Sequence, residues 1–282
     1  MTEINIDTLL GPAEAELAAA GIENYFMESR WLLGAVLRIH SSILFAHPDL
    51  EITPARQEQF RRWVRERAGG KPLAYITGDA PFYELDFFVD PAVLIPRPET
   101  EELVELCLAR MPDQGLLLDL GCGSGCIGIS LVHQKPQWHL HLLDISEAAL
   151  IVARKNKSRH LAGNPNVFFH QGDFFTALPQ ELQFDMIVSN PPYIHPDEEA
   201  SLDASVLDYE PHEALFHPDP VRLYADLIQT AATRLRPQGH LAMELAPRWS
   251  AAVLDAARQH FAEAHIEKDM SDKDRMLIAR LA

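Results

Sequence analysis

The sequence has few cysteines and no long apolar run, and each shortage excludes a class of protein. Its 282 residues include only 3 cysteines, which are too few for a disulfide framework. Cys122 and Cys126 lie four residues apart, but no second Cys or His pair accompanies them, so we expect packed thiols and no metal site. No apolar run reaches the roughly 18 residues of a membrane span. The acidic start MTEINID also lacks the basic residues of a secretory signal, so we expect a cytoplasmic protein without a membrane partner.

Basic side chains are also scarce, and their distribution is uneven. The formal net charge is −17, which argues against direct nucleic-acid binding, because phosphate contacts need many Lys and Arg side chains. Residues 1–80 carry 8 basic and 11 acidic side chains, whereas residues 81–282 carry 16 and 30. The one basic cluster is 56-RQEQFRRWVRERAGGK-71. It fits either a solvated helix face or a docking surface for an acidic partner.

The first 98 residues predict a small helical domain followed by a linker. Within residues 1–71 apolar side chains recur at three- and four-residue spacing, and breaks fall near Gly21, at His47-Pro48 and at Gly69-Gly70. Residues 72–98 are rich in β-branched and aromatic side chains between turn signals at Gly78-Asp79 and Asp90-Pro91, which predicts a β-hairpin linker.

Residues 99–282 alternate between apolar runs and helical patterns, which predicts an α/β domain with a mostly parallel sheet. Two further strands around a charged turn are expected in residues 265–282, which makes seven strands with an antiparallel pair at the end. The five preceding strands are expected at 115–121, 139–145, 166–171, 184–189 and 239–245. The helices are expected at about 100–111, 125–135, 146–161, 221–236 and 247–264.

A glycine-rich loop follows the first of these strands. The strand ends at Asp119, and Gly121, Cys122, Gly123, Ser124 and Gly125 follow before a helix begins. In a doubly wound sheet ligands bind outside the carboxyl ends of the strands, and glycines let the backbone approach a ligand closely. Dinucleotide-binding folds use a similar turn, so the glycines alone do not identify the ligand. The Asp119 carboxylate beside the loop suits the ammonium group of an amino acid better than a pyrophosphate.

Acidic residues also end the next two strands. Asp144 comes 23 residues after Gly121, near the offset at which a carboxylate meets ribose hydroxyls. It also fits a cap for the helix that starts near Ser146. Asp173 and Phe174 follow the third strand, where an acid and an aromatic wall suit adenine, although a turn with core aromatics fits as well.

The segment 187-IVSNPPYIHP-196 places Asn190, Pro191, Pro192 and Tyr193 directly after a buried strand. Prolines stop strand pairing, so a structural turn is one explanation. With the glycine loop, this segment resembles the class I S-adenosylmethionine-dependent methyltransferases over about residues 99–282. In that family Asn-Pro-Pro-Tyr occurs in enzymes that methylate a planar NH2 group. The Asn190 side-chain oxygen and the Pro191 carbonyl suit its two N–H donors, and Tyr193 offers a flat face.

Asn-Pro-Pro-Tyr fits glutamine amide, adenine N6 and cytosine N4 equally well, so other segments must separate these acceptors. The stretches 72-PLAYITGDAPFYELDFFVDP-91, 94-LIPRPETEELVE-105 and 207-LDYEPHEALF-216 resemble the PrmC (HemK) family of peptide chain release factor glutamine methyltransferases. So does the order of a helical domain, a hairpin and a catalytic domain. The resemblance spans nearly the whole chain. One departure is Phe174, where some relatives have Trp.

This resemblance implies methylation of the side-chain amide (N5) of glutamine in the Gly-Gly-Gln loop of class I bacterial release factors. It implies that residues 1–71 bind the release factor and that residues 99–282 hold S-adenosylmethionine. We expect a monomer, although the sequence itself carries no signal for or against self-association. The donor-binding residues would be Asp119, Gly121, Cys122, Gly123, Ser124, Gly125, Asp144, Asp173, Phe174 and Asn190. The glutamine would meet Asn190, Pro191, Pro192, Tyr193 and Arg97.

Three alternatives remain open at this stage. A sister enzyme methylates a glutamine of a ribosomal protein, although the junction 95–100 favours the release-factor branch. A DNA adenine methyltransferase should carry a basic recognition region, which a chain of net charge −17 lacks. A non-catalytic protein that binds translation factors would have no need of an intact Asn-Pro-Pro-Tyr.

Overall fold

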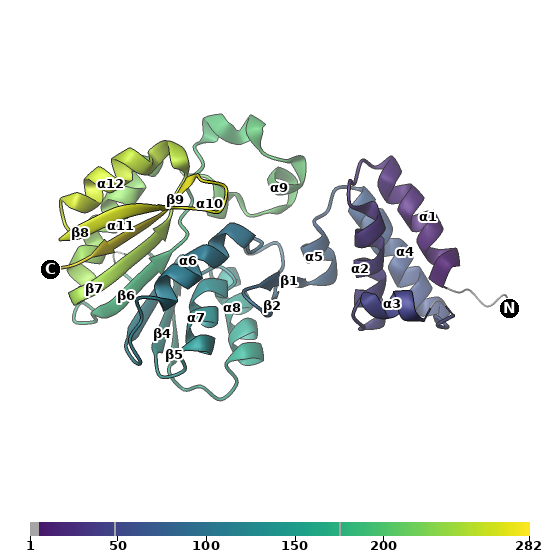
Figure 1. Ribbon diagram of the computed structural model, residues 1–282, viewed down its shortest axis with the longest axis horizontal. Helices are drawn as coiled ribbons and strands as arrows, with labels where there is room; N and C mark the ends of the chain where they lie inside the picture. The colour runs from purple at the N-terminus through teal and green to yellow at the C-terminus, as the bar shows by residue number, and fades with distance from the viewer. Residues whose placement is uncertain (1–5, 48, 175) are drawn as a thin grey trace. The chain divides into compact units, whose positions relative to one another are not determined.

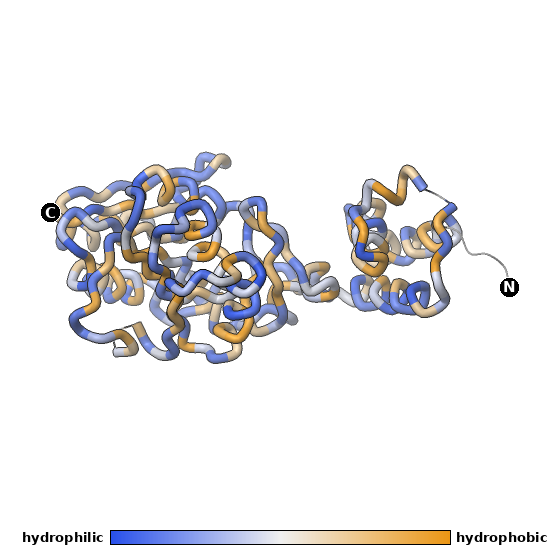
Figure 2. The backbone as a smooth tube through the Cα atoms, turned by 90° about the horizontal axis from the view of Figure 1, so that it is seen from below, coloured by the Kyte–Doolittle hydropathy of each residue, from blue (hydrophilic) through white to orange (hydrophobic). Residues whose placement is uncertain are grey.

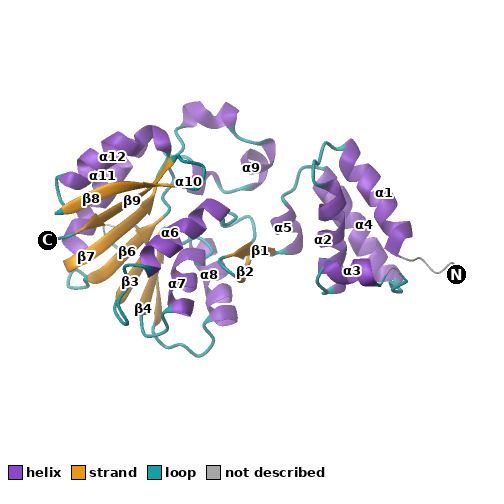
Figure 3. Cartoon of the chain, in the orientation of Figure 1, coloured by secondary structure: helices purple, strands orange, loops and turns teal. Residues whose placement is uncertain are grey.

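The computed structural model describes residues 6–47, 49–174 and 176–282, which form two compact units. The N-terminal unit consists of the chain up to Asp79 together with residues 203–209. The sheet unit consists of residues 80–202 and 210–282. Figure 1 labels the elements along the chain, and Figure 3 shows that helices dominate the first unit and that the large sheet lies in the second.

The N-terminal unit is helical, as its apolar spacing predicts. Leu17, Leu32, Leu33 and Phe60 are among the side chains of its buried core, and apolar stretches alternate with polar ones along its helices (Figure 2). The helices of this unit are α1 (Ile6–Ala19), α2 (Tyr25–Leu37), α3 (Ser42–Ala46), α4 (Pro54–Ala68), α5 (Leu73–Thr77) and α9 (Ala204–Tyr209).

The breaks between these helices follow the sequence signals in part. Gly21, with φ of 81°, follows α1, and Gly69 follows α4. The break after α3 begins at His47, whereas Pro48 lies outside the described residues. An additional break after α2 was not predicted. There Arg38 adopts a left-handed conformation with φ of 60°, a role that sequence reasoning assigns to glycine.

The predicted hairpin is present but is shorter than residues 72–98. Its strands are β1 (Asp79–Phe82) and β2 (Leu85–Phe88). Tyr83 and Glu84 form the turn with φ of 46° and 62°, although neither is a residue typical of such turns. Residues 73–77 form the short helix α5 instead of a strand, and Gly78 ends this helix in the left-handed conformation.

Within the described residues, the large sheet of the sheet unit has seven strands, in the order β5-β4-β3-β6-β7-β9-β8. The first five are mutually parallel, and β9 pairs antiparallel with both β7 and β8, as the sequence predicts. The strands are β3 (Leu116–Leu120), β4 (His139–Asp144), β5 (Val167–Gln171), β6 (Phe184–Ser189), β7 (Leu235–Glu244), β8 (Glu263–Lys268) and β9 (Asp274–Arg280).

Helices cover both faces of this sheet, and two hydrophobic clusters fill the space beneath them. Leu117 belongs to one cluster and Leu118 to the other, because successive side chains of a strand point to opposite faces. The helices are α6 (Pro98–Leu108), α7 (Cys126–Gln134), α8 (Glu147–His160), α10 (His212–Leu215), α11 (Pro220–Arg234) and α12 (Ser250–Arg258), with 3-10 turns at Pro196–Ser201 and Pro247–Trp249. No helix among the described residues is long and apolar enough to cross a membrane.

Two predicted helices are too long at their C-terminal ends, because strand pairing takes over there. The helix predicted at 221–236 ends at Arg234, since Leu235 already pairs with Phe184 of β6. The helix predicted at 247–264 is limited to residues 250–258 after a 3-10 turn. Glu263 then begins β8 by pairing with Arg280 of β9, a partner that lies beyond the reach of local sequence signals.

Candidate active site

The predicted site residues gather at one edge of the sheet. β3 lies between β4 and β6, so the strand order reverses beside β3 (Figure 3). Parallel strands bring their carboxyl ends to the same edge, and ligands bind at such reversal points. Asp119, Asp144 and Asn190 each stand at or next to the end of one of these three strands.

The glycine loop adopts a backbone that only glycine takes easily. Gly121, Gly123 and Gly125 have φ of 65°, 53° and 79°. A Cβ atom on Gly121 or Gly123 would meet no atom within 4 Å, so the backbone faces open space at both positions. On Gly125 it would lie 2.8 Å from Ile129 Cδ1, so this glycine also serves the packing of α7. The loop therefore offers a bare backbone surface that a ligand can approach.

Asp144 connects this loop to the next strand. Its Oδ2 accepts a hydrogen bond from the Gly123 N–H at 2.8 Å, and its Oδ1 accepts one from the Ser146 N–H at 2.9 Å. The cap of α8 is Ser146, whose Oγ accepts from the Ala149 N–H, so Asp144 is not the capping side chain. Burial raises the pKa of Asp144, and these backbone N–H groups act in the opposite direction.

Asp119 is almost completely buried beneath the loop. Its Oδ2 accepts from the Gly128 N–H at 2.8 Å, whereas its Oδ1 has no hydrogen-bond partner within the described residues. Burial and, to a smaller extent, the Asp144 carboxylate raise its pKa to about 7 against the opposing effect of the Gly128 N–H. An unpartnered buried carboxylate oxygen is costly unless a donor meets it.

The other predicted donor-site residues differ in exposure. Asp173 is exposed, and Phe174 is 4% exposed within one hydrophobic cluster, both after β5 at the same edge. Cys122 and Ser124 are buried in the loop, where the Cys122 N–H donates to the Leu143 carbonyl. We call Asp119, Gly121–Gly125 and Asp144 the glycine-loop cluster.

A second set of polar side chains surrounds Asn190. The Asn190 Nδ2 lies 3.4 Å from Thr100 Oγ1 on α6 and donates to it. The Thr100 hydroxyl donates to Glu244 Oε2 at 2.7 Å, and the Tyr193 hydroxyl donates to Glu244 Oε1 at 3.0 Å. We call these four residues the Asn190 cluster. The predicted Asn190 and Tyr193 are therefore held by two side chains, Thr100 and Glu244, for which no role was predicted.

Glu244 and Thr100 carry weak sequence signals. Glu244 is the last residue of β7, the same position that Asp144 occupies on β4, so an acid at a strand end was the available clue. Thr100 lies within residues 94–105, a segment that stands out only because it resembles the family, and nothing in the sequence marks Thr100 itself. Burial raises the pKa of Glu244, and burial together with the Glu244 carboxylate raises the pKa of Tyr193, so the phenol keeps its proton.

Arg97 has a partner of its own in the sheet unit. It forms an ion pair with Glu210 at 2.5 Å, and Glu210 also accepts a hydrogen bond from the Ile95 N–H at 3.2 Å. The Ile194 N–H donates to the Leu215 carbonyl at 3.1 Å, so the two ends of the segment between these residues are joined. Arg97 thus connects residues 94–105 with residues 207–216, the two segments that resemble the family. Its contact with the substrate stays a prediction.

Asn156 is a further buried residue that sequence reasoning missed. From α8 its Nδ2 donates to the carbonyls of Phe88 and Ser124, each at 2.9 Å, and its Oδ1 accepts from the Phe88 N–H at 2.7 Å. One fully buried side chain therefore holds strand β2 of the hairpin and the glycine loop together.

The cysteines are free thiols, and burial raises the pKa of Cys107 and of Cys126 to about 12. Thiols with so high a pKa are protonated and are poor nucleophiles at neutral pH. No group of three or more His, Cys, Asp or Glu side chains in the described ranges is arranged to hold a metal ion.

Comparison with known structures agrees with the fold of the sheet unit. A methyltransferase from Pyrococcus furiosus superimposes with a TM-score of 0.52 at 18% identity and covers 81% of this chain and 98% of its own. The 16S rRNA N2 G1207 methyltransferase of Thermus thermophilus, solved with AdoMet and guanosine, superimposes with a TM-score of 0.53 at 20% identity over 72% of this chain and 50% of its own. At such identities these similarities concern the fold alone.

Sequence comparison is more specific. Residues 100–207 match the model of the methyltransferase small domain, and residues 8–78 match that of the PrmC N-terminal domain. The release factor glutamine methyltransferase of Leptospira interrogans is 39% identical over 97% of both chains. The enzyme of that name from Moorella thermoacetica is 39% identical over 96% of both chains. This chain belongs to the family of release factor glutamine methyltransferases.

Proposed function

We propose that this protein transfers a methyl group from S-adenosylmethionine to the side-chain amide nitrogen of the glutamine in the Gly-Gly-Gln loop of bacterial release factors. One observation carries the proposal. Asn190, Pro191 and Tyr193 directly follow β6 at the strand-order reversal beside β3, which carries the glycine loop, so a planar amide and a methyl donor can meet there. The relatives named for this activity span nearly the whole chain.

The residues of the glycine-loop cluster fit the proposed donor. The bare backbone at Gly121 and Gly123 gives room for a close approach. Asp119 Oδ1 is a buried acceptor that no described residue meets with a hydrogen bond, which suits the ammonium group of the donor's amino acid part. Asp144 stands at the end of β4, where a carboxylate suits ribose hydroxyls, and Asp173 and Phe174 follow β5, where they suit adenine.

When bound, S-adenosylmethionine supplies an electrophilic sulfonium methyl group. The chain itself supplies alignment. The Asn190 Oδ1 and the Pro191 carbonyl accept the two N–H bonds of the glutamine amide, which orients the nitrogen lone pair. Prolines keep these acceptors fixed before the substrate arrives. The substrate can release its proton to water, so no residue need act as a strong base, in agreement with a Tyr193 that stays protonated.

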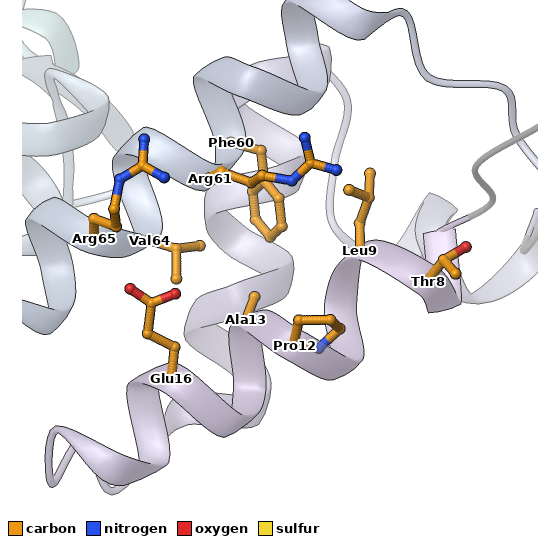
Figure 4. A pocket seen from close by; sticks show the side chains of 9 residues that line it. All are labelled: Thr8, Leu9, Pro12, Ala13, Glu16, Phe60, Arg61, Val64 and Arg65. Atoms are coloured by element: carbon orange, nitrogen blue, oxygen red, sulfur yellow. The ribbon is translucent and has the colours of Figure 1, made fainter. Parts of the chain in front are cut away.

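We propose three functional parts along the chain: residues 1–71 bind the release factor, residues 72–98 link, and residues 99–282 catalyse. A hollow of about 170 Å³ in the N-terminal unit supports the first role. Leu9, Phe60 and Val64 line its apolar interior, while two cations, Arg61 and Arg65, and one carboxylate, Glu16, stand at its side (Figure 4). An apolar floor with exposed cations suits an acidic protein surface. The proposed setting is the cytoplasm, with the enzyme acting as a monomer.

A methylation assay with labelled S-adenosylmethionine tests this function. Three acceptors are offered: a release factor, a glutamine-bearing ribosomal protein and adenine-containing duplex DNA. We expect label in the release factor alone, and its loss when the Gly-Gly-Gln glutamine is replaced. Labelling of either other acceptor in preference to the release factor would contradict the proposal.

A further inference from the structure

The Asn190 cluster contains a buried carboxylate whose two oxygens are both occupied by hydroxyl donors. Glu244 is 2% exposed at the end of β7. Its Oε1 accepts from Tyr193 and its Oε2 from Thr100, and no Lys or Arg within the described residues forms an ion pair with it. Arg275 contributes only a favourable longer-range charge. The two hydroxyl protons thus point inward to Glu244.

This arrangement determines which way the Asn190 amide faces. A hydroxyl has a single proton, and that of Thr100 is committed to Glu244, so toward Asn190 the Thr100 oxygen can only accept. The Asn190 Nδ2, 3.4 Å away, supplies the donor. The opposite orientation would place Asn190 Oδ1 against the Thr100 oxygen, acceptor against acceptor. The two orientations of a side-chain amide have nearly the same shape, so its hydrogen bonds decide between them.

We infer that Glu244 and Thr100 are positioning residues that keep the Asn190 amide oxygen turned toward the substrate. The inference rests on the proposed function, because an NH2 substrate needs an acceptor from Asn190. A flipped Asn190 would present its own NH2 group and oppose the substrate's donors. Glu244 also fixes Tyr193 through its hydroxyl, while the Trp249 Nε1–H donates to the Tyr193 carbonyl at 3.2 Å.

Glu244→Gln is the substitution that separates positioning from packing. Glutamine has nearly the shape of glutamate, but one of its two ends donates instead of accepting. When that end faces Thr100, the Thr100 proton is released and can donate to Asn190 Oδ1, which stabilises the flipped amide. A residue that only fills space tolerates this change, whereas a residue that sets hydrogen-bond direction does not.

The test measures kcat and KM with a release factor for Glu244→Gln, Thr100→Val and Thr100→Ser. We expect Glu244→Gln and Thr100→Val to lower kcat by about 10- to 100-fold, as expected for loss of an oriented acceptor, with KM for S-adenosylmethionine unchanged. Thr100→Ser keeps the hydroxyl and should restore kcat to within about threefold of the wild type. Tyr224→Phe is the matched control. Its hydroxyl donates to the backbone carbonyl of Glu244 and not to the carboxylate, so its removal should leave kcat unaltered.

Two further measurements decide the outcome. In an Asn190→Ala background, Glu244→Gln should lower kcat by much less than it does in the wild type, because its action through Asn190 is gone and only its bond to Tyr193 remains. In the unliganded protein, NMR should show the Asn190 side-chain NH2 protons exchanging faster with solvent in Thr100→Val than in the wild type. Full kcat in Glu244→Gln, or an undiminished effect without Asn190, would overturn the inference. A wild type that leaves release factors unmethylated would refute the proposed function instead, while the NMR result would still test the orientation.

Discussion

The glycine-loop cluster and the Asn190 cluster lie at the same edge of one sheet but are held together differently. In the first, the Asp119 and Asp144 carboxylates accept from backbone N–H groups that lie 9, 21 and 2 residues away in sequence. In the second, side chains hold side chains across separations of 51, 90 and 144 residues. The first cluster therefore depends on local chain geometry and the second on the assembled sheet.

This difference predicts how each cluster responds to substitution. Backbone donors remain when a side chain of the glycine-loop cluster is removed, so such changes should affect ligand affinity and stability. Donors and acceptors in the Asn190 cluster disappear with their side chains, so changes there should affect the rate of the chemical step.

The largest effect should come from Asn190→Ala. It removes the proposed acceptor and should lower kcat by about 10²–10³-fold, the usual cost of losing an oriented hydrogen-bond group. Thermal unfolding should change little, since Asn190 is only partly buried and its bond to Thr100 is long. Near-normal turnover in this variant would remove Asn190 from the mechanism.

Asp144→Ala should act on affinity instead. We expect calorimetry to show S-adenosylmethionine binding weakened by about 1–3 kcal/mol, because the ribose hydroxyls of the ligand and the Gly123 N–H lose an acceptor. Ser146→Ala is the control. It removes the α8 cap and should cost about 1 kcal/mol of stability without weakening the binding of S-adenosylmethionine. Equal affinities for wild type and Asp144→Ala would restrict Asp144 to holding the loop.

Asp119 should make the stability of the unliganded protein depend on pH. Its pKa is raised from 3.8 to about 7, so between these values the folded state holds a proton that the unfolded state has released. Stability should therefore fall as pH rises through this window, by up to about 1.4 kcal/mol per pH unit. Denaturant unfolding from pH 4 to 7 should show a shallower fall in Asp119→Asn. Parallel curves for the two proteins would show that Asp119 is not the responsible group.

The smallest effect should come from the basic helix α4. Arg61 and Arg65 are exposed, and Arg65 pairs with Glu58 at 3.2 Å, a kind of surface pair that contributes little. Neutralising Arg61, Arg62 and Arg65 should slow association with a release factor by a few-fold at low salt and less at high salt. Neutralising three exposed basic residues of the sheet unit, Arg159, Arg222 and Arg258, is the matched control for net charge. Equal rates at both salt concentrations would leave α4 a solvated face.

The same contrast between clusters explains how far the sequence could predict the structure. The strand that precedes Gly121 was predictable, and so was the number of residues between Gly121 and Asp144, because both depend on nearby residues. Glu244 could be seen only as an acid at a strand end, since its partners become neighbours when β6, β7 and α6 assemble. The early end of the helix at Arg258 has the same origin, because β8 forms only against β9.

Turns formed by residues other than glycine could not be predicted from the sequence either. Arg38, Tyr83 and Glu84 adopt positive φ that their side chains disfavour, so the residue types at these positions do not predict a turn. The Tyr83 N–H, for example, donates to the Glu101 carboxylate at 3.1 Å, a contact from α6 that no local pattern reveals.

Residues 203–209 belong to the N-terminal unit, whereas the chain on either side of them belongs to the sheet unit. Within the N-terminal unit the Tyr209 hydroxyl donates to the Gly69 carbonyl at 3.3 Å. The polypeptide therefore passes between the units three times. A protease that cuts once near Asp79 does not divide the protein into its two units, because the C-terminal fragment keeps one helix of the N-terminal unit. Clean separation of the units requires three cuts, so mixing the two fragments from a single cut amounts to a complementation experiment.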